Sequence, residues 1–212
     1  TIEPAFIAAE GDSGLRPGET WRIGDLIQFM LVGSSNDGAT ALAATAGALW
    51  GETTDTDDYA GGMGVFVREM NKEAQRLGLT QTFFLNPTGL DISPEVSGAY
   101  GSVRDVVALF KTALSERPEL FEATQYEEAT LQTETMEEHR ALNTNDAVSV
   151  LSRLIASKTG YTDLAGGNLL VALDAGLNHR IFIAVLGSTE EGRFNDVGVL
   201  ARAALASVGS TP

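Results

Sequence analysis

The chain of 212 residues lacks cysteine and contains only two histidines. Disulfides, thiolate zinc sites and thiol nucleophiles are therefore excluded, and a metal site with three histidine ligands cannot form. Basic residues are also scarce, because 14 lysines and arginines face 29 acidic residues and give a net charge of −15 at pH 7. A nucleic-acid binder needs a cationic face, so we expect no nucleic acid as a partner.

Long apolar runs are missing as well. The longest, Ile181 to Leu186, is far too short to cross a membrane, and no basic and apolar leader opens the chain. With 43% hydrophobic and 20% charged residues, the composition is that of a globular protein rather than a disordered one. We therefore predict a single domain over residues 1–212 with a substantial core.

The first half of the chain favours helices. The acidic, Gly-flanked stretch 51–62 is predicted to be a loop, residues 79–101 a long irregular connection, and Gly78 a helix C-cap. Four segments carry apolar or small residues at helical spacing. They are residues 23–32, 38–50, 63–77 and the segment that follows the capping residue Ser102.

The last third of the chain favours a sheet. The second and third of its apolar stretches are predicted to pair as an antiparallel hairpin, and residues 190–207 form a closing helix. This order predicts an α+β fold, with a helical subdomain at about 20–120 and a sheet subdomain at about 121–207. The apolar stretches are residues 151–162, 168–173 and 180–187.

Two motifs have ordinary interpretations. Gly11-Asp12-Ser13-Gly14 is reminiscent of a trypsin-like protease, but that mechanism needs a histidine base in a β-barrel, and residues 1–120 favour helices. We interpret it as a polar turn. Asp55-Thr56-Asp57-Asp58 hints at calcium, but the residues that follow do not complete the loop pattern, so we interpret it as a solvated acidic loop.

Two further motifs gain weight from each other. Ser34-Ser35-Asn36 lies between two predicted helices, where such a sequence is usually an N-cap. Lys158-Thr159-Gly160 ends an apolar segment, where a lysine is usually a surface cation. In this order and in these settings, the two motifs together resemble the serine D-alanyl-D-alanine carboxypeptidases, the low-molecular-weight penicillin-binding proteins. The active-site motifs of that superfamily are Ser-x-x-Lys, Ser-x-Asn and Lys-Thr-Gly.

The resemblance spans roughly residues 7–205. Five separated stretches agree with family sequence in the same order, which makes the match specific. They are residues 29–37, 70–79, 86–91, 142–145 and 158–163.

The resemblance implies a β-lactamase/transpeptidase-like fold, in which a helical cluster adjoins an antiparallel sheet covered by a C-terminal helix. It also implies a serine-type enzyme that removes the terminal D-Ala from peptidoglycan stem peptides through an acyl-enzyme, without a cofactor or metal. The expected partners are peptidoglycan stem peptides and β-lactams. The location is then extracytoplasmic, with membrane contact only through an anchor outside this chain. A β-lactamase and a non-catalytic peptidoglycan-binding relative remain alternatives.

The resemblance also assigns roles to the residues of the second and third motifs. Ser34 relays a proton toward the leaving amine, and Asn36 hydrogen-bonds the substrate's peptide carbonyl. Lys158 supplies positive charge beside Ser34 and attracts an anionic tail, a local exception in an acidic protein.

Four further residues are expected to bind substrate. Thr159 binds the terminal carboxylate, and Gly160 belongs to the same motif. The backbone N–H of Tyr161 forms half of an oxyanion hole. Thr144 stands where some relatives carry a carboxylate-binding arginine, so its role is open.

The first family motif is missing, because no lysine has a serine three positions before it. We expect the N-terminal strands and the nucleophile helix to be absent by truncation, cleavage or true loss. The strand at about 180–187 would then be an exposed apolar edge that associates with the missing segment or with another copy. The lysines are Lys72, Lys111 and Lys158, preceded at that spacing by Glu69, Ala108 and Ile155.

Overall fold

The structure, a computed structural model, describes residues 1–8, 14–51, 59–176 and 179–209. The acidic loop 55–58 and the turn at Gly11-Asp12-Ser13-Gly14, apart from its last residue, lie outside the described residues. The elements, including the short 3₁₀ helices η1 to η3, follow in chain order. They are η1 Pro4–Phe6, α1 Ile23–Gly33, α2 Asn36–Trp50, α3 Tyr59–Arg76, β1 Phe83–Phe84, β2 Ala99–Tyr100, α4 Val103–Glu116, η2 Pro118–Gln125, β3 Glu128–Gln132, β4 Glu138–Leu142, η3 Val148–Val150, β5 Leu154–Thr162, β6 Gly166–Asp174, β7 Arg180–Ser188 and α5 Gly192–Gly209.

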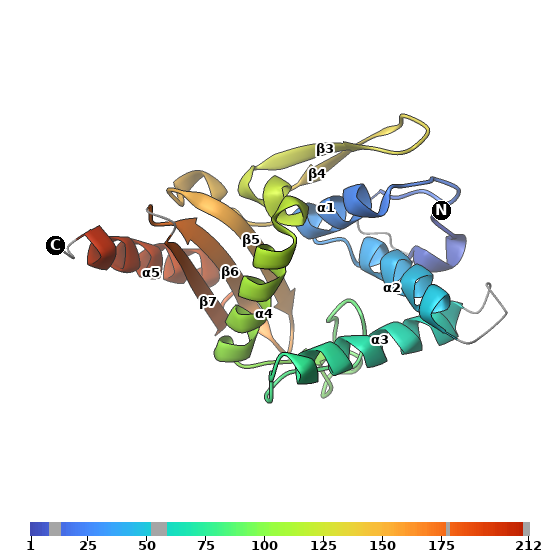
Figure 1. Ribbon diagram of the computed structural model, residues 1–212, viewed down its shortest axis with the longest axis horizontal. Coiled ribbons are helices and arrows are strands. Elements are labelled where there is room, and N and C mark those ends of the chain that lie inside the picture. Colours follow the sequence, from blue (N-terminus) through green and yellow to red (C-terminus); the bar gives the residue numbers. More distant parts are fainter. Residues whose placement is uncertain (9–13, 52–58, 177–178, 210–212) are drawn as a thin grey trace.

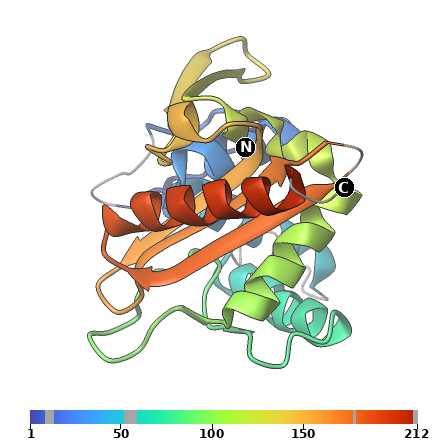
Figure 2. The same ribbon diagram turned by 90° about the vertical axis from the view of Figure 1, so that its left-hand side faces the viewer.

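The last third of the chain forms an antiparallel sheet of three strands in the order β5-β6-β7. Helix α5 lies across one face of this sheet and α4 lies on the other (Figures 1 and 2). Helices followed by a sheet and a covering helix confirm the predicted α+β class. Among the described residues β7 is an edge strand, while its association with another chain stays a prediction.

The two faces of the sheet are packed by alternate residues of β6, because successive side chains of a strand point to opposite sides. Leu169, Val171 and Leu173 pack against α5 in one apolar cluster. Leu170 and Ala172 pack toward α4 in another. The central strand is thus apolar on both faces, as expected for a strand that is buried between two helical layers.

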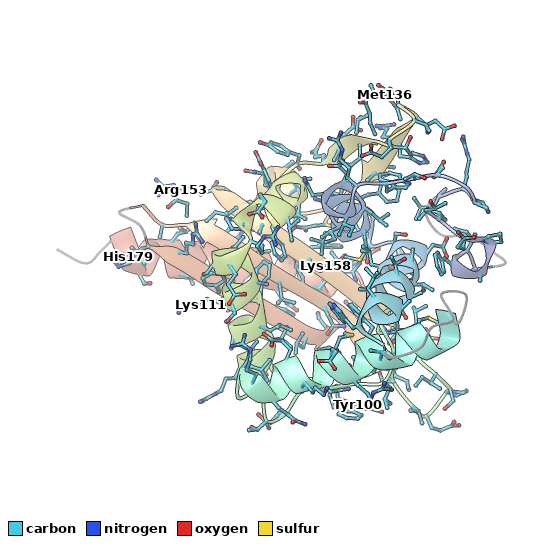
Figure 3. All side chains as sticks on the ribbon, turned by 45° about the vertical axis from the view of Figure 1, so that its right-hand side comes forward. Tyr100, Lys111, Met136, Arg153, Lys158 and His179 are labelled. Atoms are coloured by element: carbon cyan, nitrogen blue, oxygen red, sulfur yellow. The ribbon has the colours of Figure 1, made fainter. Side chains whose placement is uncertain are left out.

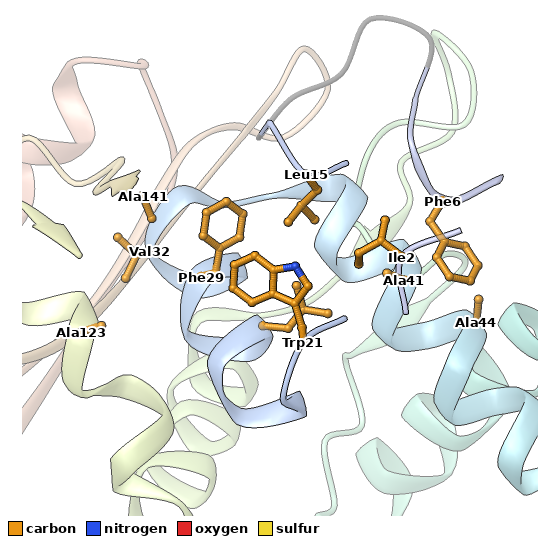
Figure 4. Close-up of a cluster of buried hydrophobic side chains, with 11 residues drawn as sticks. Ile2, Phe6, Leu15, Trp21, Phe29, Val32, Ala41, Ala44, Ala123 and Ala141 are labelled. Atoms are coloured by element: carbon orange, nitrogen blue, oxygen red, sulfur yellow. The ribbon is translucent and has the colours of Figure 1, made fainter. Parts of the chain in front are cut away.

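A separate apolar cluster surrounds α1 (Figure 4). Trp21 and Phe29 lie with their ring centroids 5.3 Å apart, and the hairpin β3–β4 packs against the same helix. The sequence did not predict this hairpin, which projects beyond α1 and away from the sheet (Figure 1). Helix α1 is therefore packed against the hairpin as well as against α2 and η2.

One polar pair is enclosed in this cluster. A hydrogen bond of 2.9 Å joins Nε2 of His139 on β4 to Oε1 of Glu19, and both side chains are almost fully buried. The indole N–H of Trp21 donates to the other carboxylate oxygen at 3.4 Å, and the Trp21 and His139 rings lie 5.0 Å apart. The pair therefore links β4 to the segment that leads into α1.

Helices α2 and α3 approach each other through glycine. A Cβ atom on Gly47 would lie 1.8 Å from the carbonyl oxygen of Gly62, so the backbones are in direct contact. Only glycine fits such a contact. Helix α3 begins at Tyr59, so the loop predicted over 51–62 is wrong in its last four residues.

Most other predicted elements are confirmed. Ser102 caps α4 by accepting a hydrogen bond from the Asp105 N–H, and Gly78 follows α3 with a φ of +70°. Helix α2 begins at Asn36, two residues earlier than predicted, because Ser35 accepts a hydrogen bond from the Gly38 N–H and caps the helix there. The division into two subdomains stays a prediction. No helix in the described part of the chain is long and apolar enough to span a membrane.

Candidate active site

The junction between α1 and α2 places Ser34 and Asn36. Ser34 ends α1 in the left-handed conformation, with φ 53° and ψ 41°, and its N–H donates to the Met30 carbonyl. A non-glycine residue in this conformation costs roughly 1 kcal/mol or more. Since Ser35 then caps α2, the chain reverses within two residues, and Asn36 is the first residue of the second helix.

Strand β5 brings Lys158 to this junction. Its Nζ donates to Ser34 Oγ at 2.6 Å and to the Thr159 carbonyl at 2.8 Å. Lys158 lies centrally, between the sheet and the helices of the first half (Figure 3). The contact joins two motifs that are separated by 124 residues.

The pKa of Lys158 is lowered to about 8, chiefly by burial and then by the nearby positive charge of Arg193. Burial acts in this direction because it disfavours the charged form of an amine. At pH 7 the side chain is therefore mostly a cation, but one that gives up its proton far more readily than an exposed lysine. A group of this kind can both attract an anion and exchange a proton with the Ser34 hydroxyl.

Thr144 lies in the segment between β4 and η3 and reaches the site through Thr159. Its N–H donates to the Val32 carbonyl at 3.3 Å, and its hydroxyl is hydrogen-bonded to the Thr159 hydroxyl. Thr144 does not line the cavity beside Lys158, whereas Thr159 does. The structure thus places Thr144 as a partner of Thr159 and not as part of the cavity wall.

The cavity has a volume of about 820 Å³. Another part of its wall comes from Pro87 and Leu90 in the loop between β1 and β2 and from Tyr100 of β2. The remaining predicted site residues converge on it from α1, α2 and β5. They are Ser34, Asn36, Lys158, Thr159, Gly160 and Tyr161.

Asp91 does not line the cavity but binds two residues that do, Thr162 and Leu164, a role that the sequence did not single out. One of its carboxylate oxygens accepts from the Thr162 hydroxyl and the other from the Leu164 N–H, both at 3.0 Å. These bonds tie the loop between β1 and β2 to the end of β5. Asp91 belongs to one of the stretches with family resemblance, but no spacing rule pairs it with Thr162.

Arg193 is the second residue that sequence reasoning missed. It lies in the first turn of α5, and its Nη1 donates to the Gly160 carbonyl at 2.8 Å. The available signal was weak: an arginine at the start of a predicted helix, where the helix dipole disfavours a cation.

The described side chains of the cavity offer hydroxyls, the amides of Asn36 and Asn168, the amine of Lys158 and one carboxylate, that of Glu95. The amine and the hydroxyls around it suit a ligand with a peptide group and an anionic end. The described residues contain no cluster of three or more potential metal ligands. A cation and a hydroxyl in contact, facing a strand edge with backbone donors, is an arrangement for acyl transfer when a nucleophile is supplied.

The fold and the two facing motifs define a protein of the β-lactamase and transpeptidase-like class. Comparison with known families agrees: residues 10–190 match the D-alanyl-D-alanine carboxypeptidase family, peptidase S11, and the chain belongs to that family.

The chain is similar to D-alanyl-D-alanine carboxypeptidase DacB2 of Mycobacterium tuberculosis, with 28% identity over 179 residues that make up 84% of this chain and 55% of the relative. It thus spans about half the length of that relative. A crystal structure of a D-alanyl-D-alanine carboxypeptidase from the same organism matches with a TM-score of 0.77 and 28% identity, covering 96% of this chain and 72% of the other. Penicillin-binding protein D2 from Listeria monocytogenes, solved in its cefotaxime-bound form, matches with a TM-score of 0.69 and 27% identity, covering 100% of this chain and 74% of the other.

Proposed function

We propose that this chain forms the substrate cleft of a serine-type D-Ala-D-Ala carboxypeptidase that removes the terminal D-Ala from peptidoglycan stem peptides. The observation that carries the proposal is the 2.6 Å contact between Lys158 and Ser34 at the wall of one cavity, in a chain of this family. The contact brings two family motifs that are 124 residues apart to the wall of the same cavity.

The proposed roles follow from the positions of the groups. Lys158 and the Thr159 hydroxyl bind the terminal carboxylate of the peptide, since both line the cavity and one carries positive charge. Thr144 orients the Thr159 hydroxyl through the hydrogen bond between the two hydroxyls. Asn36 hydrogen-bonds the peptide carbonyl, and Ser34 passes a proton from Lys158 to the leaving amine, which departs as D-alanine.

The acyl-enzyme step needs a serine activated by a base. The 212 residues contain no Ser-x-x-Lys, so the proposal requires a nucleophile from elsewhere in the protein. The backbone N–H of Tyr161 then provides one of the two donors that stabilise the oxyanion. Loss of one such donor lowers the rate by about 10²- to 10³-fold in other acyl-transfer enzymes.

A labelled penicillin and a peptide ending in D-Ala-D-Ala together test the proposal. The 212-residue chain should reversibly bind an N-acetylated peptide ending in D-Ala-D-Ala, and Lys158→Met should weaken that binding. Lys111→Met is the control and should not weaken it, because Lys111 is an exposed lysine on α4. Mass spectrometry should find no penicillin adduct on this chain. An adduct on Ser34 would overturn our account of the nucleophile.

The same experiment on the gene's complete product separates the enzyme from the non-catalytic alternative. Covalent penicillin labelling and release of D-alanine support the carboxypeptidase. Peptide binding without labelling or D-alanine release supports a binding protein, and rapid penicillin turnover supports a β-lactamase.

β-lactams are proposed as ligands on the strength of the cefotaxime-bound relative. An extracytoplasmic location is proposed because peptidoglycan is the substrate.

A further inference from the structure

Arg193 is a buried cation in an unfavourable place. Its side chain is only 7% exposed and lies in the first turn of α5, where the helix dipole opposes positive charge. Its Nε has no hydrogen-bond partner among the described residues. Burial of a charge is costly unless the charge meets a specific partner. Arg193 has two such partners: the ring of Phe194, with the guanidinium 4.7 Å from its centroid, and the carbonyl of Gly160, in the Lys-Thr-Gly motif.

The start of α5 is built to bring this side chain within reach of β5. Thr189 caps the helix, since its hydroxyl accepts from the Gly192 N–H and its carbonyl accepts from the Arg193 N–H. A Cβ atom on Gly167 would lie 2.1 Å from the Thr189 carbonyl oxygen, so the helix start is pressed directly onto β6. Beside this glycine the pairing of β6 with β7 shifts register.

The direction of the Gly160 carbonyl follows from its neighbours. The Thr159 carbonyl accepts from Lys158 Nζ and therefore lies on the cavity side of the strand. Successive carbonyls of an extended strand point to opposite edges, so the Gly160 carbonyl points away from the cavity. Because the peptide bond is trans, the N–H of Tyr161 points opposite to that carbonyl, toward the cavity.

We propose that Arg193 is a positioning residue that holds the Gly160–Tyr161 peptide from behind, so that the Tyr161 N–H is fixed and polarised toward the reacting carbonyl of the substrate. A donor on the carbonyl of a peptide strengthens the N–H of the same peptide as a donor, since linked hydrogen bonds polarise one another. The role of that N–H rests on the proposed function, whereas the contact itself does not.

A second consequence of the same position concerns Lys158. The charge of Arg193 is the second cause, after burial, of the lowered pKa of that lysine. Arg193 therefore acts on two groups of the cavity without lining it: it orients a donor through a hydrogen bond, and it eases proton release from Lys158 through its charge.

The test uses the 212-residue chain and three variants, Arg193→Gln, Arg193→Lys and Arg202→Gln. Arg202 is an exposed residue of the same helix, and its variant removes the same charge far from the site. NMR follows the Tyr161 amide signal and the titration of Lys158 Nζ, and calorimetry measures affinity for an acetylated peptide ending in D-Ala-D-Ala. Circular dichroism checks that each variant is folded.

We expect Arg193→Gln to shift and broaden the Tyr161 amide signal, to raise the pKa of Lys158, and to weaken peptide binding by roughly fivefold, as for loss of one hydrogen bond. Arg193→Lys should leave the pKa of Lys158 unchanged, because it retains the positive charge. It should still move the Tyr161 amide signal away from its position in the unmodified chain, because it loses the planar donor geometry. Arg202→Gln should change none of the three. If Arg193→Gln does not fold, the Arg193→Lys result decides.

An unchanged Tyr161 amide in folded Arg193→Gln, or equal changes in Arg202→Gln, would overturn the inference. The proposed function fails in a different way, through absence of peptide binding by the unmodified chain. The two NMR measurements need no peptide and report on Arg193 in either case.

Discussion

Two hydrogen-bonded polar pairs connect the two ends of α1 to strands β4 and β5, and the surroundings of the two pairs differ. His139 and Glu19 lie inside an aromatic cluster, under Trp21. Lys158 and Ser34 lie at the opposite end of the helix, on the wall of a large cavity. Both pairs link residues more than a hundred positions apart. The first pair is closed off by apolar side chains, while the second faces space for a ligand.

The comparison shows that burial of a polar pair does not by itself indicate function. The enclosed pair has its hydrogen-bonding groups satisfied by the protein, which suits a structural role. The pair at the cavity combines a strained residue, Ser34, with a cation of lowered pKa, Lys158. Strain and a shifted pKa beside open space are features of sites that act on a ligand. Variants can test whether this division of roles is correct.

The largest effect is expected at the enclosed pair. His139→Ala leaves the Glu19 carboxylate buried without its imidazole partner, and the free energy of unfolding should fall by about 3–5 kcal/mol in urea denaturation. The neighbouring residue provides a control, because the ion pair of Arg140 with Glu128 is exposed, and Arg140→Ala should cost less than about 1 kcal/mol. Equal losses in the two variants would contradict a structural role for the enclosed pair.

Lys158→Met should have the opposite profile. Affinity for the acetylated peptide should fall roughly tenfold or more, because a charge-assisted hydrogen bond to its carboxylate is lost. Stability at pH 7 should not fall, since the substitution removes a cation whose burial is unfavourable. Calorimetry and thermal unfolding measure the two quantities. A large loss of stability with unchanged affinity would make this pair structural too.

The pH dependence sharpens the same point. The pKa of Lys158 is about 8 in the folded chain, against the ordinary value of 10.5. Peptide affinity should therefore decline as the pH rises through about 8, and Lys158→Met should show no such decline. The folded chain releases this proton more easily than the unfolded chain, so below about pH 8 the charged lysine lowers the free energy of unfolding. This penalty disappears as the pH rises from about 8 to about 10.5, and the free energy of unfolding increases over that window. Comparison of urea denaturation with Lys158→Met over that window checks the sign.

The smallest effect concerns the backbone at Ser34. Ser34→Gly and Ser34→Ala both remove the hydroxyl, but only glycine relieves the left-handed conformation. The free energy of unfolding of Ser34→Gly should therefore exceed that of Ser34→Ala by about 1 kcal/mol, as measured by thermal unfolding. Met136, an exposed residue with a φ of +65°, offers the same glycine-against-alanine comparison outside the site. No difference at Ser34 beside a clear one at Met136 would show that Ser34 is not strained.

The sequence was sufficient for the parts of the site that depend on local patterns. A polar break between two helical periods predicted the turn that carries Ser34 and Asn36. The residues of β5 could be recognised because an apolar segment ends in a family motif. Capping rules placed Ser102 correctly, and they indicated an N-cap within Ser34-Ser35-Asn36, where Ser35 caps α2; only the helix start, predicted at about residue 38, was two residues late.

The rest depended on contacts between distant residues. The hairpin β3–β4 was missed because one of its inward positions is a histidine, which hides the alternation of apolar and polar residues. Asp91 and Arg193 were missed as site residues because each acts through a partner far along the chain, Thr162 and Gly160. No propensity or spacing rule names such partners before the fold is known.

The glycine contact between α2 and α3 has a consequence at the other end of both helices. Asn71 of α3 holds β1 through two hydrogen bonds to Phe84, and the loop that follows β1 forms a wall of the cavity. A methyl group added at Gly47 would wedge the two helices apart and displace that wall relative to Asn36, which begins the same helix as Gly47. The width of the cavity therefore depends in part on the absence of a side chain at a distant crossing of two helices.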